Sequence, residues 1–84
     1  MRLPLIKQLS NFIAENDSDF ITESIKVLED LCDARGIKDE ELDVIGELLS
    51  NMEGSLEVQK LIEEGASQRE ALNAFMKRVT SIGK

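Results

Sequence analysis

One stretch decides the fold, and it reads DEELDVIGELLSNMEGSLEVQKLIEE from Asp39 to Glu64. Five apolar residues recur along it at alternating spacings of three and four, which is the pattern of a coiled-coil seam: Leu42, Ile45, Leu49, Met52 and Leu56. Asp39 is expected to cap this helix, followed by Glu40 and Glu41 in its first turn. An unbroken helix over 39–64 would be about 39 Å long at 1.5 Å per residue. A globule of this size has a radius of gyration of about 12 Å, so the helix either bends near Gly54 or needs cover from elsewhere.

Small residues interrupt the same stretch four residues apart, at Gly46, Ser50 and Gly54. A glycine inside a helix costs about 1 kcal/mol relative to alanine, so a close packing contact is the expected reason for two of them. The contact could lie within the chain, between the third helices of two copies, or at a hinge. The candidate helix-packing or dimer residues are therefore Leu42, Ile45, Gly46, Leu49, Ser50, Met52, Gly54 and Leu56.

Outward from this stretch, helical periodicity predicts three further helices, at about 4–15, 19–35 and 68–81. The first begins at Pro4, which suits a first helical turn, and the second carries an apolar stripe: Phe20, Ile21, Ile25, Leu28, Leu31 and Cys32. Gly36 is expected to end the second helix, and Ser67 with Glu70 forms a capping box that begins the fourth. The sequence thus predicts one all-α domain over 1–84, a small four-helix up-and-down bundle with a long third helix, completed by dimerisation.

Composition argues against an enzyme. The chain of 84 residues contains no His, Tyr or Trp and only one Cys, so imidazole acid–base chemistry and a zinc site are excluded. The carboxylates that begin at Asp17 fail the EF-hand spacing, since Thr22 stands at the position of the required Gly and Leu28 at that of the required Glu. No phosphate-binding loop or nucleophile elbow occurs. We expect no catalytic residue, no metal and no cofactor.

Charge is unevenly distributed along the chain. The formal net charge is −7, but residues 15–64 alone contribute −12, while the first fourteen and the last twenty residues are net basic. An acidic chain repels phosphate backbones, which excludes direct nucleic-acid recognition and favours a protein partner with a basic surface. No apolar run exceeds three residues and the N-terminal residues have no signal-peptide pattern, so neither a membrane span nor export is expected. A cytoplasmic location is expected, and the single Cys agrees with a reducing compartment.

Two residues keep an alternative function open. Ser18 follows Asp17 at a helix start, as the modified serine does in small acidic acyl carriers. Asp19 follows it where carriers have an apolar residue, so a simple N-cap role is the preferred account of Ser18. Cys32 could serve a redox accessory protein. Its place near a helix C-terminus, between Asp30 and Asp33, disfavours a reactive thiolate and favours buried packing.

The segments Lys38 to Gly54 and Glu70 to Val79 resemble a family of short, acidic, uncharacterised bacterial proteins. The resemblance extends over most of the chain and implies a stand-alone helical protein without assigned catalytic residues. Together with the composition, the charge distribution and the helix pattern, this resemblance favours a non-enzymatic interaction or adaptor protein that acts as a homodimer. A small carrier using Ser18, or a redox accessory using Cys32, is the alternative.

Overall fold

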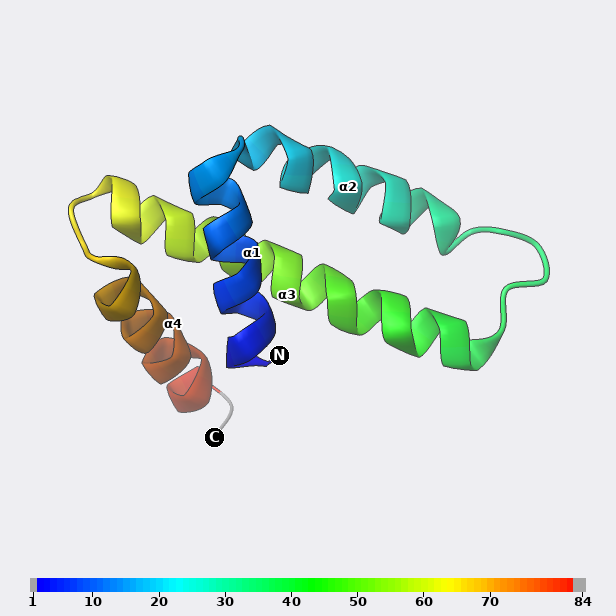
Figure 1. Cartoon of the computed structure of the whole chain (residues 1–84). Helices are drawn as coiled ribbons and strands as arrows, with labels where there is room; N and C mark the ends of the chain where they lie inside the picture. The colour runs from blue at the N-terminus through cyan, green and yellow to red at the C-terminus, as the bar shows by residue number, and fades with distance from the viewer. Residues whose placement is uncertain (1, 83–84) are drawn as a thin grey trace.

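The computed structural model of the chain describes residues 2–82, and the side chains of residues 2–80. It contains four helices in this range and no strand: α1 (Leu3–Glu15), α2 (Ser18–Leu31), α3 (Asp39–Glu63) and α4 (Gln68–Ile82) (Figure 1). The predicted all-α class and the long third helix are confirmed. Helix α3 is continuous through Gly54, so the bend considered at that residue does not occur.

Local hydrogen bonds explain where α3 ends and α4 begins. Gly65 adopts a φ of 116°, and the N–H of Ala66 donates to the carbonyl of Leu61 at 3.1 Å, which is the Schellman arrangement. The predicted capping box is confirmed: the Ser67 N–H donates to Oε1 of Glu70 at 3.0 Å, and the Glu70 N–H donates to Oγ of Ser67 at 3.1 Å.

One helix ends well before its predicted end, and two helices have a different N-cap from the one predicted. Helix α2 ends at Leu31, four residues before the expected end at 35, because the chain from Cys32 onward forms successive turns that lead to Gly36, whose φ is 87°. Asp17, and not Ser18, is the N-cap of α2, since its carboxylate accepts the N–H of Asp19 at 2.9 Å. Lys38, and not Asp39, is the N-cap of α3.

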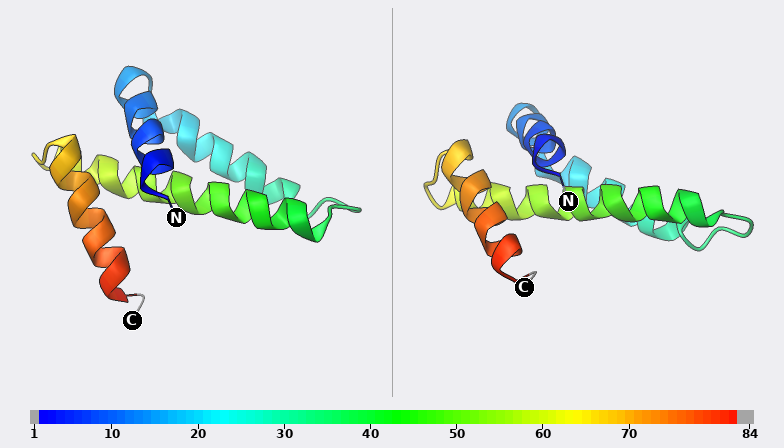
Figure 2. Two further views of the ribbon diagram at one scale, coloured as in Figure 1. Left: turned by 60° about the horizontal axis from the view of Figure 1, so that its bottom comes forward. Right: turned by 90° about the horizontal axis from the view of Figure 1, so that it is seen from below.

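The helices are arranged around α3, which contacts each of the other three. Helix α2 lies antiparallel to α3, whereas α1 and α4 cross α3 steeply, so the arrangement is less regular than an up-and-down bundle (Figures 1 and 2). The molecule is flat, with principal extents of 44 × 34 × 17 Å and a Cα radius of gyration of 13.7 Å. A compact globule of this length would measure about 12 Å. Much of the apolar surface therefore stays close to solvent.

The main core lies at one end of the molecule, where α1 and α4 meet the C-terminal half of α3. It consists of five buried residues: Ile6, Val58, Ala71, Leu72 and Phe75. Toward the other end, α2 and the N-terminal half of α3 form an antiparallel arm that projects beyond this core (Figure 1). Among its described residues, only Ile21 and Ile45 are buried apolar side chains.

A buried amide joins α1 to α3 beside the core. Asn51 is 1% exposed, and its Oδ1 accepts the backbone N–H of Arg2 at 2.9 Å while its Nδ2 donates to the carbonyl of Glu47 at 2.8 Å. Arg2 is the N-cap of α1, so Asn51 satisfies one of the free amides at that helix start. The contact fixes where α1 crosses α3.

The capping box predicts a pH dependence. The Ser67 backbone N–H, and then its hydroxyl, stabilise the carboxylate of Glu70 and hold the pKa of that residue below its ordinary value. The resulting stability is present above the unfolded-state pKa and is lost as the pH falls through the lower folded-state pKa. Glu70→Gln keeps an acceptor but removes the titration. The Tm difference between wild type and variant, followed by circular dichroism, should be largest at neutral pH and shrink in acid; a constant difference would contradict this origin.

Candidate functional site

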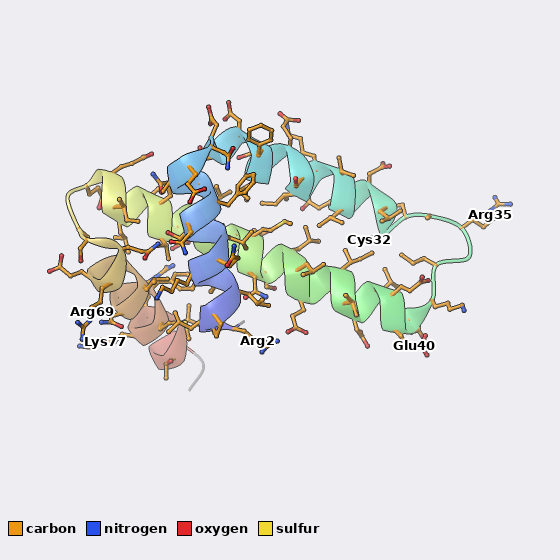
Figure 3. The ribbon with its side chains drawn as sticks, viewed as in Figure 1. Arg2, Cys32, Arg35, Glu40, Arg69 and Lys77 are labelled. Atoms are coloured by element: carbon orange, nitrogen blue, oxygen red, sulfur yellow. The ribbon has the colours of Figure 1, made fainter. Side chains whose placement is uncertain are left out.

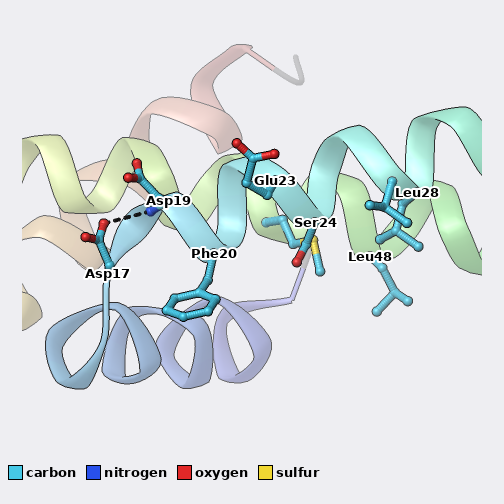
Figure 4. Close-up of a pocket in the computed structure, with 9 residues that line it drawn as sticks. Asp17, Asp19, Phe20, Glu23, Ser24, Leu28 and Leu48 are labelled. Carbon is cyan, nitrogen blue, oxygen red and sulfur yellow. Dashed lines mark hydrogen bonds between the residues drawn. The ribbon is translucent and has the colours of Figure 1, made fainter.

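An open groove of about 800 Å³ lies on the arm formed by α2 and α3. Its apolar walls come from α2 (Phe20, Val27 and Leu28) and from α3 (Leu48 and Met52), and its remaining lining residues are Ser24, Asp17, Asp19 and Glu23. We call this feature the α2–α3 groove (Figure 4). Because the groove is apolar within and carboxylate-lined at one edge, it suits a ligand that is itself amphipathic.

The wall on α2 exists because the apolar residues of this helix occupy more than one face. Ile21 faces the interior, whereas Phe20, Val27 and Leu31 are 57%, 66% and 47% exposed. Phe20 and Leu31 belong to the apolar stripe predicted for this helix, but both are exposed. Phe20, Ser24, Val27 and Leu31 follow one another at spacings of four, three and four. They form a seam along about three turns of α2 that is exposed except at the half-buried Ser24.

The wall on α3 faces this seam. Leu48 is 40% exposed, and Val44, one turn earlier on the same side of α3, is also exposed. A smaller hollow of about 150 Å³ adjoins the groove, since Leu48 and Met52 line both, and Leu5 and Leu9 of α1 form its far side. The apolar surface thus continues from α2 across α3 to α1.

An aromatic pair closes the end of the groove nearest α1. The rings of Phe12 and Phe20 meet edge to face with centroids 5.8 Å apart, and Phe20 points toward α1 in Figure 4. Such pairs contribute about 0.5–1.5 kcal/mol beyond their buried area. The pair holds Phe20 in place although more than half of this side chain is exposed, so the wall is formed before any partner binds.

Carboxylates border the same end of the groove. Asp17 and Asp19 stand at the start of α2, and Glu23 follows one turn later (Figure 4). The nearby cation is Lys26, whose Nζ lies 3.9 Å from Oε1 of Glu23, but both side chains are about 70% exposed. A pair this exposed contributes little, so the edge of the groove keeps its negative charge.

Most of the apolar seam predicted for α3 is buried or half-buried by other parts of the same chain. Ile45 is buried, and the four other members are half-buried: Leu42, Leu49, Met52 and Leu56. Only Met52 belongs to the groove. Sequence reasoning missed Phe20, Val27 and Leu48 as an exposed set. The available signal was the breadth of the apolar surface on α2, which exceeds the single face that one neighbouring helix covers.

The small residues of α3 fall into two environments. A Cβ built on Gly54 would lie 3.0 Å from Cζ of Phe75 and 3.2 Å from Cδ1 of Ile6, so α1 and α4 pack closely at this position. A Cβ on Gly46 would meet nothing within 4 Å. Ser50 is half-buried between them. The expected close contact thus occurs within the chain at Gly54 but not at Gly46, where a contact with a second copy remains a prediction.

The residues of the alternative functions lie in ordinary local structure. Ser18 is the first residue of α2, and its carbonyl accepts a hydrogen bond from the Thr22 hydroxyl at 3.4 Å. Cys32 is the half-buried C-cap of the same helix. Over residues 2–82, no group of three His, Cys, Asp or Glu side chains converges as metal ligands would. The same range contains no helix whose length and hydropathy would allow it to cross a bilayer.

Several basic residues lie away from the groove. Arg2, Arg69 and Lys77 lie around the N-terminus of α1 and along α4, whereas Arg35 and Glu40 lie at the far end of the arm (Figure 3). Arg78, also on α4, pairs with Glu57 of α3 and lies 5.8 Å from the centroid of the Phe75 ring. The charge asymmetry of the sequence is therefore also an asymmetry in space, because residues 17–50, which form the arm, carry eleven acidic and three basic residues, whereas the described residues around the core carry six of each.

Comparison with known proteins gives one match. The model of a family of unknown function (DUF6952) matches residues 1–82, which is nearly the whole chain. No curated protein and no solved structure matches the chain.

Proposed function

The chain belongs to the family of unknown function DUF6952, and from its geometry we propose that it is a protein-interaction module whose binding surface is the α2–α3 groove. The observation that supports this most directly is the exposed apolar surface that Phe20 and Val27 form opposite Leu48. The exposed Leu31 extends this surface along α2 beyond the groove. Contiguous exposed apolar surface with a polar border is typical of protein-binding sites. The groove offers shape and apolar area but no arrangement of reactive groups, which favours binding over catalysis.

Site-specific crosslinking tests this function. A photoreactive residue at position 27, introduced in cells that naturally produce the chain, should yield a discrete crosslinked protein, because Val27 is the most exposed apolar residue of the groove. Position 74 is the matched control, since Ala74 is exposed on α4 but lines neither hollow. The additional substitution Leu48→Lys should abolish the product by placing a charge in the groove.

The variant is readily checked for folding, because Leu48 is 40% exposed and its replacement should leave the helical circular dichroism signal unchanged. Equal crosslinking from positions 27 and 74, or a product that survives Leu48→Lys in a folded protein, would contradict the proposal. The carrier and redox alternatives are not proposed, since the surroundings of Ser18 and Cys32 give no observation in their favour.

The homodimer expected from the sequence is a separate proposal. The seam that motivated it is buried or half-buried within one chain, so a dimer contact would use the outer face of α3, where Gly46 lies open. This contact would leave the α2–α3 groove free. Self-association and partner binding are therefore compatible.

A further inference from the structure

We infer that the α2–α3 groove binds an amphipathic helix of another protein, with an apolar stripe flanked by lysine or arginine residues. This inference rests on the proposed function and specifies the chemistry of the partner. The part of the chain that lines the groove along α2, from Asp17 to Leu28, spans about 16 Å at 1.5 Å per residue. This length matches three turns of a helix laid alongside α2. Leu48 and Met52 supply the second wall, so the apolar stripe of the occupant would insert between two antiparallel helices.

The border of the groove selects the charge of the occupant. Asp17, Asp19 and Glu23 line its edge, and Asp30 continues the row two turns further along α2 on the side of Glu23. Lys26 interrupts this row but is already beside Glu23. A helix with acidic flanks would meet like charges at the end of the groove that Asp17, Asp19 and Glu23 border, whereas lysine or arginine flanks would pair with them.

A second copy of this chain fits the groove poorly. A symmetric contact between two grooves would bring Asp19, Glu23 and Asp30 of one copy toward the same residues of the other, in a protein whose net charge is already −7. The basic surface around Arg69 and Lys77 lies elsewhere in the fold (Figure 3). Its contact with the groove of another copy would be head to tail and would not close as a simple dimer. The apolar face of α4 is also unavailable, because Ala71, Leu72 and Phe75 are in the core.

Two designed peptides test the inference directly. Both are helical, about 18 residues long, and carry the same leucine stripe; one is flanked by lysines and the other by glutamates. The lysine peptide should bind the full chain at least about tenfold more tightly at low salt, and this preference should shrink as ionic strength rises, because exposed charge pairs are screened. Fluorescence anisotropy measures both affinities, and amide chemical shifts should change at Phe20, Val27 and Leu48.

Two variants separate the roles of charge and apolar contact. The triple variant Asp17→Asn, Asp19→Asn, Glu23→Gln keeps an effective N-cap at position 17 and should remove most of the lysine preference. Leu48→Lys should weaken binding of both peptides. Equal binding of the two peptides, or a preference that the triple variant leaves intact, would overturn the inference. It would also be overturned if light scattering showed a dimer that Leu48→Lys dissociates, because a second copy would then occupy the groove.

The crosslinking experiment distinguishes the two proposals. If position 27 captures a protein but the crosslinked segment maps to an acidic or non-helical region, the inferred occupant is wrong while the interaction function stands. If position 27 yields no crosslinked protein, or only a product that is still formed in the Leu48→Lys variant, the proposed function itself is wrong. A crosslink that maps to a helix with basic flanks supports both.

Discussion

Phe75→Ala is expected to remove most of the stability of this protein. Phe75 is 3% exposed and belongs to a core of five buried residues contributed by three helices. Truncation of a buried phenylalanine costs about 3–5 kcal/mol, through lost burial and the cavity left behind. Proteins of this size have a total stability of about 4–12 kcal/mol. The flat shape leaves little other buried apolar area to compensate, so the variant should be largely unfolded or melt far below the wild type.

The other phenylalanines provide a matched control for the same chemical change. Phe20 is 57% exposed and contacts Phe12 edge to face, so Phe20→Ala should cost about 2 kcal/mol or less, from the lost ring pair and the partly buried ring area together. Urea denaturation followed by circular dichroism gives both values. Equal destabilisation by Phe75→Ala and Phe20→Ala would mean that the α1–α3–α4 core does not dominate the stability. Phe20→Ala should instead weaken binding in the groove.

Gly54→Ala and Gly46→Ala are expected to differ by about 1–3 kcal/mol in the free energy of unfolding. Both replacements gain the same helix propensity, about 1 kcal/mol in favour of alanine. Only at position 54 does the new methyl group meet the core, 3.0 Å from Phe75 and 3.2 Å from Ile6. Overpacking of this kind costs about 1–3 kcal/mol. Gly46→Ala should therefore stabilise the protein, while Gly54→Ala should be neutral or destabilising.

A double-mutant cycle tests whether crowding by Phe75 causes the effect of Gly54→Ala. Phe75→Leu removes the ring atoms that crowd position 54, so Gly54→Ala should cost less in that background than in the wild type. Chemical denaturation of the four proteins measures the coupling. If Gly54→Ala stabilises the wild type as much as Gly46→Ala does, the close approach of Phe75 and Ile6 to Gly54 does not restrict the core. If only Gly46→Ala destabilises, its open face is covered by a second copy.

Local sequence signals predicted the helices well because each one acts over a few residues. The capping box of Ser67 and Glu70, the left-handed Gly65 and the seam of α3 all specify hydrogen bonds or packing within one or two turns. The early end of α2 was harder to predict, since Cys32 to Arg35 contain no residue that forbids a helix. There the turns that lead to Gly36 replace a further helical turn.

The α2–α3 groove could not be predicted from the sequence, because it depends on which apolar side chains are covered by another helix and which are left exposed. Phe20 and Ile21 are adjacent in the sequence and similar in hydropathy, yet Ile21 is buried and Phe20 is more than half exposed. The difference arises from the steep crossing of α1 over α3, which leaves one side of α2 uncovered (Figure 1). Asn51 contributes to this crossing through a contact with Arg2 that spans 49 positions in the chain. No local pattern encodes such a contact.

Most buried apolar side chains lie at one end of α3. We therefore expect the two ends of the molecule to differ in the free energy that local opening requires. Backbone amides in α4 and the C-terminal half of α3 are protected by the five-residue core, so their hydrogen exchange requires opening of the whole fold. Amides of α2 depend on the arm, where Ile21 and Ile45 are the buried apolar side chains. They can exchange through a local opening of lower free energy. An occupant of the groove would stabilise mainly the arm formed by α2 and the N-terminal half of α3. Binding would then appear as slower hydrogen exchange of the α2 amides, with little change in the core amides.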